Sequence, residues 1–146
     1  MTAATIERQR VRPAAVQPTV QPRVPRTARQ KIELDIAISD AQSGVREALA
    51  ILQSHLEELN DGVGYGARNL FRAADIAFDA AIASQDIEDC ELASGALHIA
   101  QCVLEVITER TDDLVLWGCT RIAQASKDAI DMIVSDLMGG RQCLKY

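Results

Sequence analysis

The stretch VREALAILQSHLEEL, residues 45–59, decides the fold of this chain. Its aliphatic side chains recur at alternating spacings of four and three residues, which places them on one stripe of a helix. The stripe consists of Val45, Leu49, Leu52, Leu56 and Leu59. The chain has 146 residues, of which 48% are hydrophobic but only 3% aromatic, a composition typical of helices rather than of pleated strands. We therefore expect one all-α domain, which excludes large multi-domain enzymes.

A similar stretch follows further along the chain. Residues 48–57 read ALAILQSHLE and residues 96–105 read ALHIAQCVLE, with six of ten positions identical. Each copy lies in a helix that is followed by a turn and by a second helix with an Asp-Ala pair, at Asp79 and at Asp128. This pattern predicts two tandem αα-hairpins. A chance match between amphipathic helices of limited composition is the alternative.

Capping residues mark the expected helix starts. Thr27 and Gln30 can cap each other's backbone amides at the start of the first helix. Asp86 begins a third helix and Thr111–Asp113 a fourth, each with carboxylates where the helix dipole favours them. The expected helices span about residues 28–60, 67–83, 86–110 and 112–138.

Glycines mark the expected helix ends. Three glycines within residues 61–66 favour a left-handed end to the first helix and a short turn before the second. Gly139-Gly140 favours the same kind of end after the fourth helix. Inside the first helix, Ser43-Gly44 interrupts the apolar pattern and favours a kink or a break.

Hairpins with short loops pack most simply as an antiparallel four-helix bundle. The predicted organisation is a disordered arm at residues 1–27, a bundle at 28–138 built from hairpins 28–84 and 86–138, and a tail at 139–146. All four prolines lie in the arm, which favours an extended backbone there. Residues 1–31 hold seven basic residues against one acid, so a cationic segment precedes a body with twelve net negative charges.

Targeting and redox signals are sparse. The prolines spoil the amphipathic helix of an organelle transit peptide, and no secretory signal is present. No run approaches the roughly 20 apolar residues that span a bilayer. The four cysteines, Cys90, Cys102, Cys119 and Cys143, form no CxxC pair. We therefore expect reduced thiols and a cytoplasmic protein without membrane contact.

Candidate metal, anion and catalytic sites are weak. His98 and Cys102 share a helical face at the spacing of two metal ligands, and Cys119 or Cys90 would have to supply a third. Alternatively, Cys102 is an ordinary small core residue. The glycines of residues 61–66 could expose amides to an anion, but neither a preceding strand nor a following Lys-Ser/Thr accompanies them. An interhelical turn is the better interpretation.

Catalysis is not indicated. Glu57 and Glu105 are equivalent under the repeat and could form a carboxylate pair, although solvated charge fits them better. The two histidines, His55 and His98, offer no triad with a Ser, Thr or Cys nucleophile. We predict a protein without enzymatic activity and without a cofactor.

Nucleic acid offers two further hypotheses. The basic arm could follow phosphates, whereas the acidic body would be repelled by them. Conversely, the body could mimic a nucleic acid and inhibit a nucleic-acid-binding protein. Its acids concentrate at residues 86–91 and 109–113, at opposite ends of the bundle rather than along one face.

Excess apolar surface in the second hairpin is the feature that points to function. The polar residues of the third helix form one narrow stripe, which predicts that the rest of the helix is buried. That stripe is Glu91, Ser94, His98, Gln101, Glu105 and Thr108. The additional cover must come from residues 28–43 or from another chain.

We therefore predict a protein–protein interaction module of inhibitor, adaptor or chaperone type, whose partner is another protein or a second copy. Its predicted surface is centred on Leu97, Leu104, Leu116 and Trp117. A metal-binding bundle and an acidic nucleic-acid mimic remain the alternatives.

Overall fold

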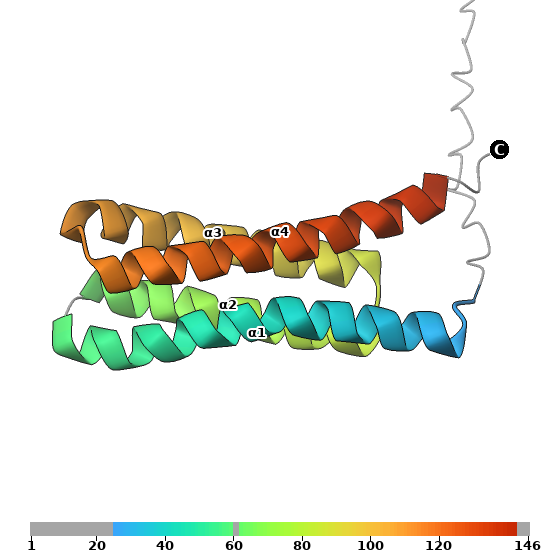
Figure 1. The fold of residues 1–146 in the computed structure, drawn as a ribbon, viewed down its shortest axis with the longest axis horizontal. Coiled ribbons are helices and arrows are strands. Elements are labelled where there is room, and N and C mark those ends of the chain that lie inside the picture. Colours follow the sequence, from blue (N-terminus) through green and yellow to red (C-terminus); the bar gives the residue numbers. More distant parts are fainter. Residues whose placement is uncertain (1–24, 60–61, 143–146) are drawn as a thin grey trace, which may run out of the picture.

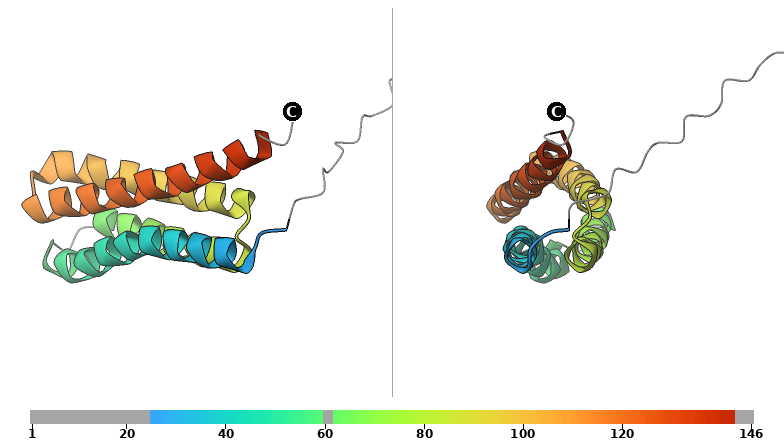
Figure 2. Two further views of the ribbon diagram at one scale, coloured as in Figure 1. Left: turned by 45° about the vertical axis from the view of Figure 1, so that its right-hand side comes forward. Right: turned by 90° about the vertical axis from the view of Figure 1, so that its right-hand side faces the viewer.

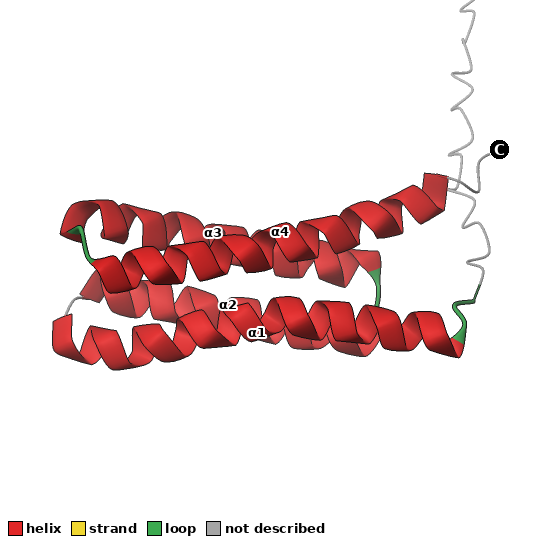
Figure 3. Ribbon diagram, in the orientation of Figure 1, coloured by secondary structure: helices red, strands yellow, loops and turns green. Residues whose placement is uncertain are grey.

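A computed structural model describes residues 25–59 and 62–142 as four helices (Figure 3). They are α1 (Ala28–Leu59), α2 (Gly62–Ser84), α3 (Ile87–Thr111) and α4 (Leu114–Gln142). Each helix packs against the next in the chain, and α4 also packs against α1, which closes a four-membered antiparallel bundle (Figures 1 and 2). The predicted all-α bundle of two hairpins is confirmed.

The core is built from the predicted stripes. Val45 and Leu52 of α1 are fully buried and Leu49 is partly buried, while the side chains of Leu56 and Leu59 lie outside the described residues. The largest fully buried side chains are Phe71, Phe78, Ile38, Leu52, Leu97, Leu104, Leu116 and Ile130. Burial of this aliphatic and aromatic area at about 25 cal/mol per Å² is the main force that holds the four helices together.

The predicted caps at two helix starts are formed. The amide of Gln30 donates to Thr27 Oγ1 over 3.2 Å, and the amide of Thr27 donates back to Gln30 Oε1 over 3.0 Å, which completes a capping box. Asp113 Oδ1 accepts from the amides of Val115 and Leu116 at the start of α4. Asp86 occupies the N-cap of α3 in an extended backbone conformation, without a side-chain capping bond.

The glycine predictions are wrong. Gly62–Gly66 form the first turns of α2 rather than an interhelical turn, and α4 continues through Gly139 and Gly140 to Gln142. No described glycine has a positive φ; the left-handed positions among the described residues are Gln85 and Asp112, each directly after a helix. Glycine permits a left-handed backbone without requiring it, so glycines alone did not locate these ends.

The helix does not break at Ser43-Gly44, because α1 continues through both residues as one helix. Gly44 instead faces Ser126 of α4: a Cβ added there would collide with Ser126 Oγ, while the next nearest atoms of Ile122 and Ser126 would lie 3.5 Å away. Glycine at this position leaves room for the Ser126 hydroxyl, at a helix-propensity cost of about 1 kcal/mol relative to Ala.

Polar contacts fix α1 against its neighbours at two levels. Gln42 is almost fully buried, and its Nε2 donates to Asp75 Oδ1 over 2.8 Å and to Asp79 Oδ1 over 2.7 Å, both in α2. Arg46 forms ion pairs with the same two carboxylates. At the other end of α1, His55 Nε2 lies 2.7 Å from Asp113 Oδ2, which joins α1 to the start of α4. These contacts set the register of α1 against its neighbours.

Candidate interaction surface

Three of the four residues predicted to contact a partner belong to the core. Leu97, Leu104 and Leu116 are fully buried among the four helices, whereas Trp117 is 41% exposed. The predicted surface therefore cannot be centred on the three leucines, because this chain's own helices already cover them. The exposed large apolar side chains of α3 are Leu92, Ile99 and Val106.

The predicted polar stripe of α3 is only partly wet, because three of its members face α4. Ser94 donates to Asp131 Oδ1, Gln101 bonds to Gln124, and Thr108 lies 3.3 Å from the hydroxyl of Thr120. Gln101 and Thr108 are buried. We call this row the α3–α4 polar ladder; its members satisfy one another's hydrogen-bonding capacity, so burying them costs little.

A line of exposed apolar and small side chains lies on the outer face of α3. We call it the α3 seam, and it consists of Leu92, Gly95, Ile99, Cys102 and Val106. Leu92, Ile99 and Val106 are 66%, 56% and 54% exposed. Ile99 follows the buried Leu97 by two residues, about 200° around the helix, so it points away from the core. The helix thus buries Gln101 and Thr108 as well as its core leucines, and it exposes three aliphatic side chains.

Opposite charges lie at the two ends of the α3 seam. Glu88 precedes Ile99 by the same number of residues as Arg110 follows it, and Leu92 and Val106 are likewise symmetric about Ile99. At about 100° per residue, all five side chains lie within about 20° of one line along the helix. Glu88 and Arg110 are exposed, and neither forms an ion pair with another described residue. The line therefore has a negative charge at one end and a positive charge at the other.

Residues 28–43 do not cover the α3 seam. They continue α1 alongside α2 and α4, on the other side of the bundle from the outer face of α3 (Figure 2). The expectation that residues 28–43 supply the additional cover is thus wrong for the α3 seam.

The start of α4 exposes a second, smaller apolar group. Leu114 is 84% exposed, and Val115 and Trp117 are each about two-fifths exposed. They form the first turn of α4, next to the last turn of α3, so this group extends the apolar surface towards one end of the bundle. Trp117 is the member that the sequence prediction and the structure share.

The metal candidate has two groups in place and no third. His98 Nε2 lies 3.7 Å from Cys102 Sγ, and both residues are exposed. Cys90 and Cys119 are fully buried, and no group of three potential ligands occurs in the described part of the chain. The fourth cysteine, Cys143, lies outside the described residues.

The cysteines differ in reactivity. Burial raises the pKa of the Cys119 thiol to about 11 and also raises the pKa of Cys90. Both thiols therefore stay protonated near neutral pH, because a buried site disfavours the thiolate. Cys102, in the middle of the α3 seam, is the exposed thiol among the described cysteines.

The other predicted sites are not assembled. The glycines proposed as an anion cradle are helical from Gly62 onwards, which leaves no loop to wrap an anion in that described segment. Glu105 is exposed and accepts from Gln101 over 3.2 Å, while the side chain of Glu57 lies outside the described residues. The carboxylate pair therefore stays an untested hypothesis.

One helix of the described residues, α3, is long and apolar enough to cross a bilayer by length and composition. The expectation that no segment approaches such a span does not hold by this criterion. Core helices of bundles pass the same test, and α3 contributes Leu97 and Leu104 to the core. The apolar length of α3 reflects two stripes, one facing the core and one facing outwards.

Comparisons with known proteins add no functional information. No protein-family model, curated protein or solved structure gives a significant match to this chain. Any functional assignment must therefore come from the surface chemistry of the bundle itself.

Proposed function

We propose that this protein is a non-enzymatic helical interaction module and that the outer face of α3 binds the same face of a second copy. The observation that supports this most directly is the distribution of polar and apolar side chains on α3. Its polar ladder is satisfied by hydrogen bonds to α4, with Gln101 and Thr108 buried, while Leu92, Ile99 and Val106 are exposed in a row. Covering such a row removes aliphatic area from water at about 25 cal/mol per Å².

The symmetry of the row favours a second copy as the partner. In an antiparallel pair with a two-fold axis at Ile99, Leu92 of one copy meets Val106 of the other, and Glu88 meets Arg110 at both ends. Such an interface pairs apolar with apolar residues and opposite charges with each other. Gly95, with nothing within 4 Å of the position of its missing Cβ, leaves room for a facing side chain.

A charge placed on the axis tests this proposal. Ile99→Asp brings two carboxylates together at the centre of an apolar interface, so we expect the variant to sediment as a single 15.9 kDa chain where the native protein sediments as two. The measurement is sedimentation equilibrium over a range of concentrations.

Ile76→Asp is the matched control. Ile76 is an exposed isoleucine of α2, 68% exposed, so its replacement carries the same chemical change away from the α3 seam. We expect Ile76→Asp to associate like the native protein. A native protein that stays a single copy at all concentrations, or an Ile99→Asp variant that associates as before, would reject the proposed pairing. Vesicle binding without self-association would assign the seam to a membrane instead.

A further inference from the structure

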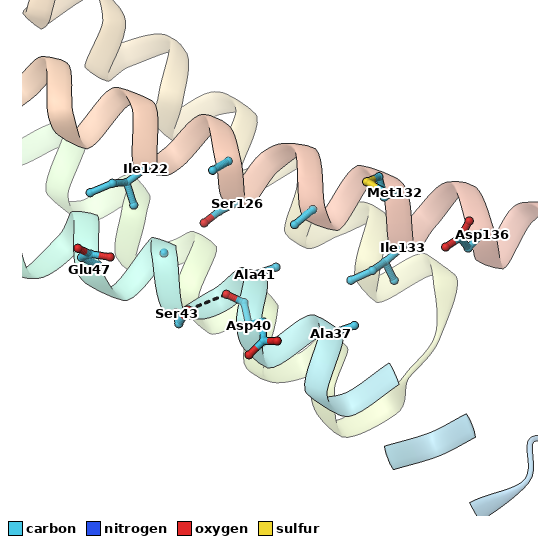
Figure 4. Close-up of a pocket in the computed structure, with 13 residues that line it drawn as sticks. Ala37, Asp40, Ala41, Ser43, Glu47, Ile122, Ser126, Met132, Ile133 and Asp136 are labelled. Carbon is cyan, nitrogen blue, oxygen red and sulfur yellow. Dashed lines mark hydrogen bonds between the residues drawn. The ribbon is translucent and has the colours of Figure 1, made fainter. Parts of the chain in front are cut away.

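A groove lies between α1 and α4 on the side of the bundle away from the α3 seam. It has a volume of about 630 Å³ and is lined by residues of these two helices. Its lining is mostly small or aliphatic, including Ala37, Ala41, Ala125, Ala129, Ile122 and Ile133. Ser126 and Ile133 point from α4 towards α1 (Figure 4). Towards the last turns of α4 the two helices diverge (Figure 1).

The charges on the groove are all of one sign. Asp40 and Glu47 of α1 and Asp136 of α4 line it, and no lining residue is basic. The three carboxylates are exposed and form no ion pair with another described residue. Two basic residues that adjoin lining residues in the sequence form ion pairs elsewhere: Arg46 pairs with Asp75 and Asp79, and Lys127 pairs with Asp131. An occupant of this groove would be apolar or small, with positive charge at its edges.

The chain itself contains a segment of that chemistry. Residues 1–24 combine Val and three prolines with four arginines, Arg8, Arg10, Arg12 and Arg23, against one acid. Proline-rich segments favour an extended backbone that needs no internal hydrogen bonds, which suits a narrow groove between helices.

The arm joins the bundle at the appropriate end. Arg26 donates to the carbonyl of Gln85 over 2.6 Å, and the Gln85 side chain donates to the carbonyl of Lys31 over 2.7 Å, so the start of α1 is held against the α2–α3 loop. The helical rise places Glu47 about 30 Å along α1 from Ala28. The segment from Arg12 to Pro25 can extend over about 40 Å. The arginines can therefore reach all three carboxylates.

We propose that the basic, proline-rich arm, residues 1–24, docks in this α1–α4 groove of its own chain. Its arginines then lie against Asp40, Glu47 and Asp136, and its Val and Pro side chains cover the alanine-lined floor. The arm thereby acts as an intramolecular cap, and an arginine- and proline-rich peptide from another source would have to displace it.

Nuclear magnetic resonance of the full chain tests this contact. We compare the backbone amide signals of the native protein with those of a variant in which Arg8, Arg10, Arg12 and Arg23 are replaced by Gln. We expect the amides of Gly44, Ala125 and Ala129 to shift between the two proteins. The difference should shrink in high salt, because exposed ion pairs are screened. Signals of the α3 seam should not change, which keeps this test separate from that of the proposed dimer.

A steric variant provides a second test. Ala125→Trp fills the groove from an exposed position, and Ala50→Trp places the same side chain on an exposed position of α1 outside the lining. In the Ala125→Trp background, we expect the Arg-to-Gln changes to leave the amide signals of the groove unshifted. In the Ala50→Trp background, we expect them to shift these signals as much as they do in the native protein. Groove signals that are identical with and without the arginines would overturn the proposal. Shifts that grow with protein concentration would contradict docking within one chain, because they would assign the arm to a neighbouring copy.

Discussion

At the scale of single residues, Asp113 links helix capping to the α1–α4 contact. Its Oδ1 caps α4 and its Oδ2 accepts from His55, so both carboxylate oxygens are used. The hydrogen bond from His55 is the main cause that lowers the pKa of Asp113, and the amides of Val115 and Leu116 add to it. The folded protein therefore holds Asp113 ionised more strongly than the unfolded chain does.

We predict that Asp113→Ala lowers the free energy of unfolding at pH 7 by about 1–2 kcal/mol, the usual value of an N-cap residue. Because the folded pKa is below the unfolded value of about 3.9, this stabilisation is complete above that value and is lost as pH falls through the folded pKa. Urea unfolding at pH 7 and pH 3 measures the difference between native protein and variant. An equal difference at both pH values would contradict the account; Glu109→Ala, an exposed acid, is the control.

Cysteine reactivity provides a second prediction at this scale. In a Cys143→Ser variant, which removes the thiol outside the described residues, we expect alkylation of the folded protein at Cys102 alone. A pKa of about 11 makes the thiolate of Cys119 rarer than that of an ordinary thiol by more than about 100-fold. Peptide mass mapping after brief exposure to iodoacetamide measures the result, and comparable labelling of Cys119 and Cys102 would be inconsistent with the structure.

At the scale of helices, Gly44 leaves room for the Ser126 side chain of α4. We predict that Gly44→Leu lowers the free energy of unfolding by about 2 kcal/mol, because the new side chain collides with Ser126 in a packed contact. Gly118→Leu is the matched control, since nothing lies within 4 Å of a Cβ at that position of α4. The control should be neutral or stabilising, because Leu favours helix over Gly by up to about 1 kcal/mol. Urea denaturation of both variants makes the comparison; equal losses would contradict a close approach at Gly44.

The helices also show how far sequence reasoning reached. Apolar spacing correctly predicted the buried stripe of Val45 and Leu52, and the spacing of Thr27 and Gln30 correctly predicted the capping box. Both features depend on residues only a few positions apart in the chain. The role of Gly44 depends on Ser126, far away in the chain, and no local pattern reveals it. The same holds for Gln101 and Thr108. Because both are polar, the sequence predicts that they face solvent, and only their partners on α4 explain why they are buried.

At the scale of the whole molecule, the sequence indicated excess apolar character in α3 but not which of its apolar side chains are exposed. Excess apolar character in α3 was visible in the sequence, but a helix with two apolar stripes does not say which stripe its own bundle buries. The seven-residue spacing of Leu92, Ile99 and Val106 was the available signal. Only the packing of α3 against α2 and α4 distinguishes this row from the core row that includes Leu97 and Leu104.

The most direct measurement of the central claim is the mass of charge-swapped variants at sedimentation equilibrium. In an antiparallel pair of α3 seams, Glu88→Arg puts like charges together at both ends of the interface, and so does Arg110→Glu. We predict that each single variant associates more weakly than the native protein and that the Glu88→Arg/Arg110→Glu double variant regains native association. Single variants that associate like the native protein, or a double variant weaker than both, would contradict the pairing of two copies through α3.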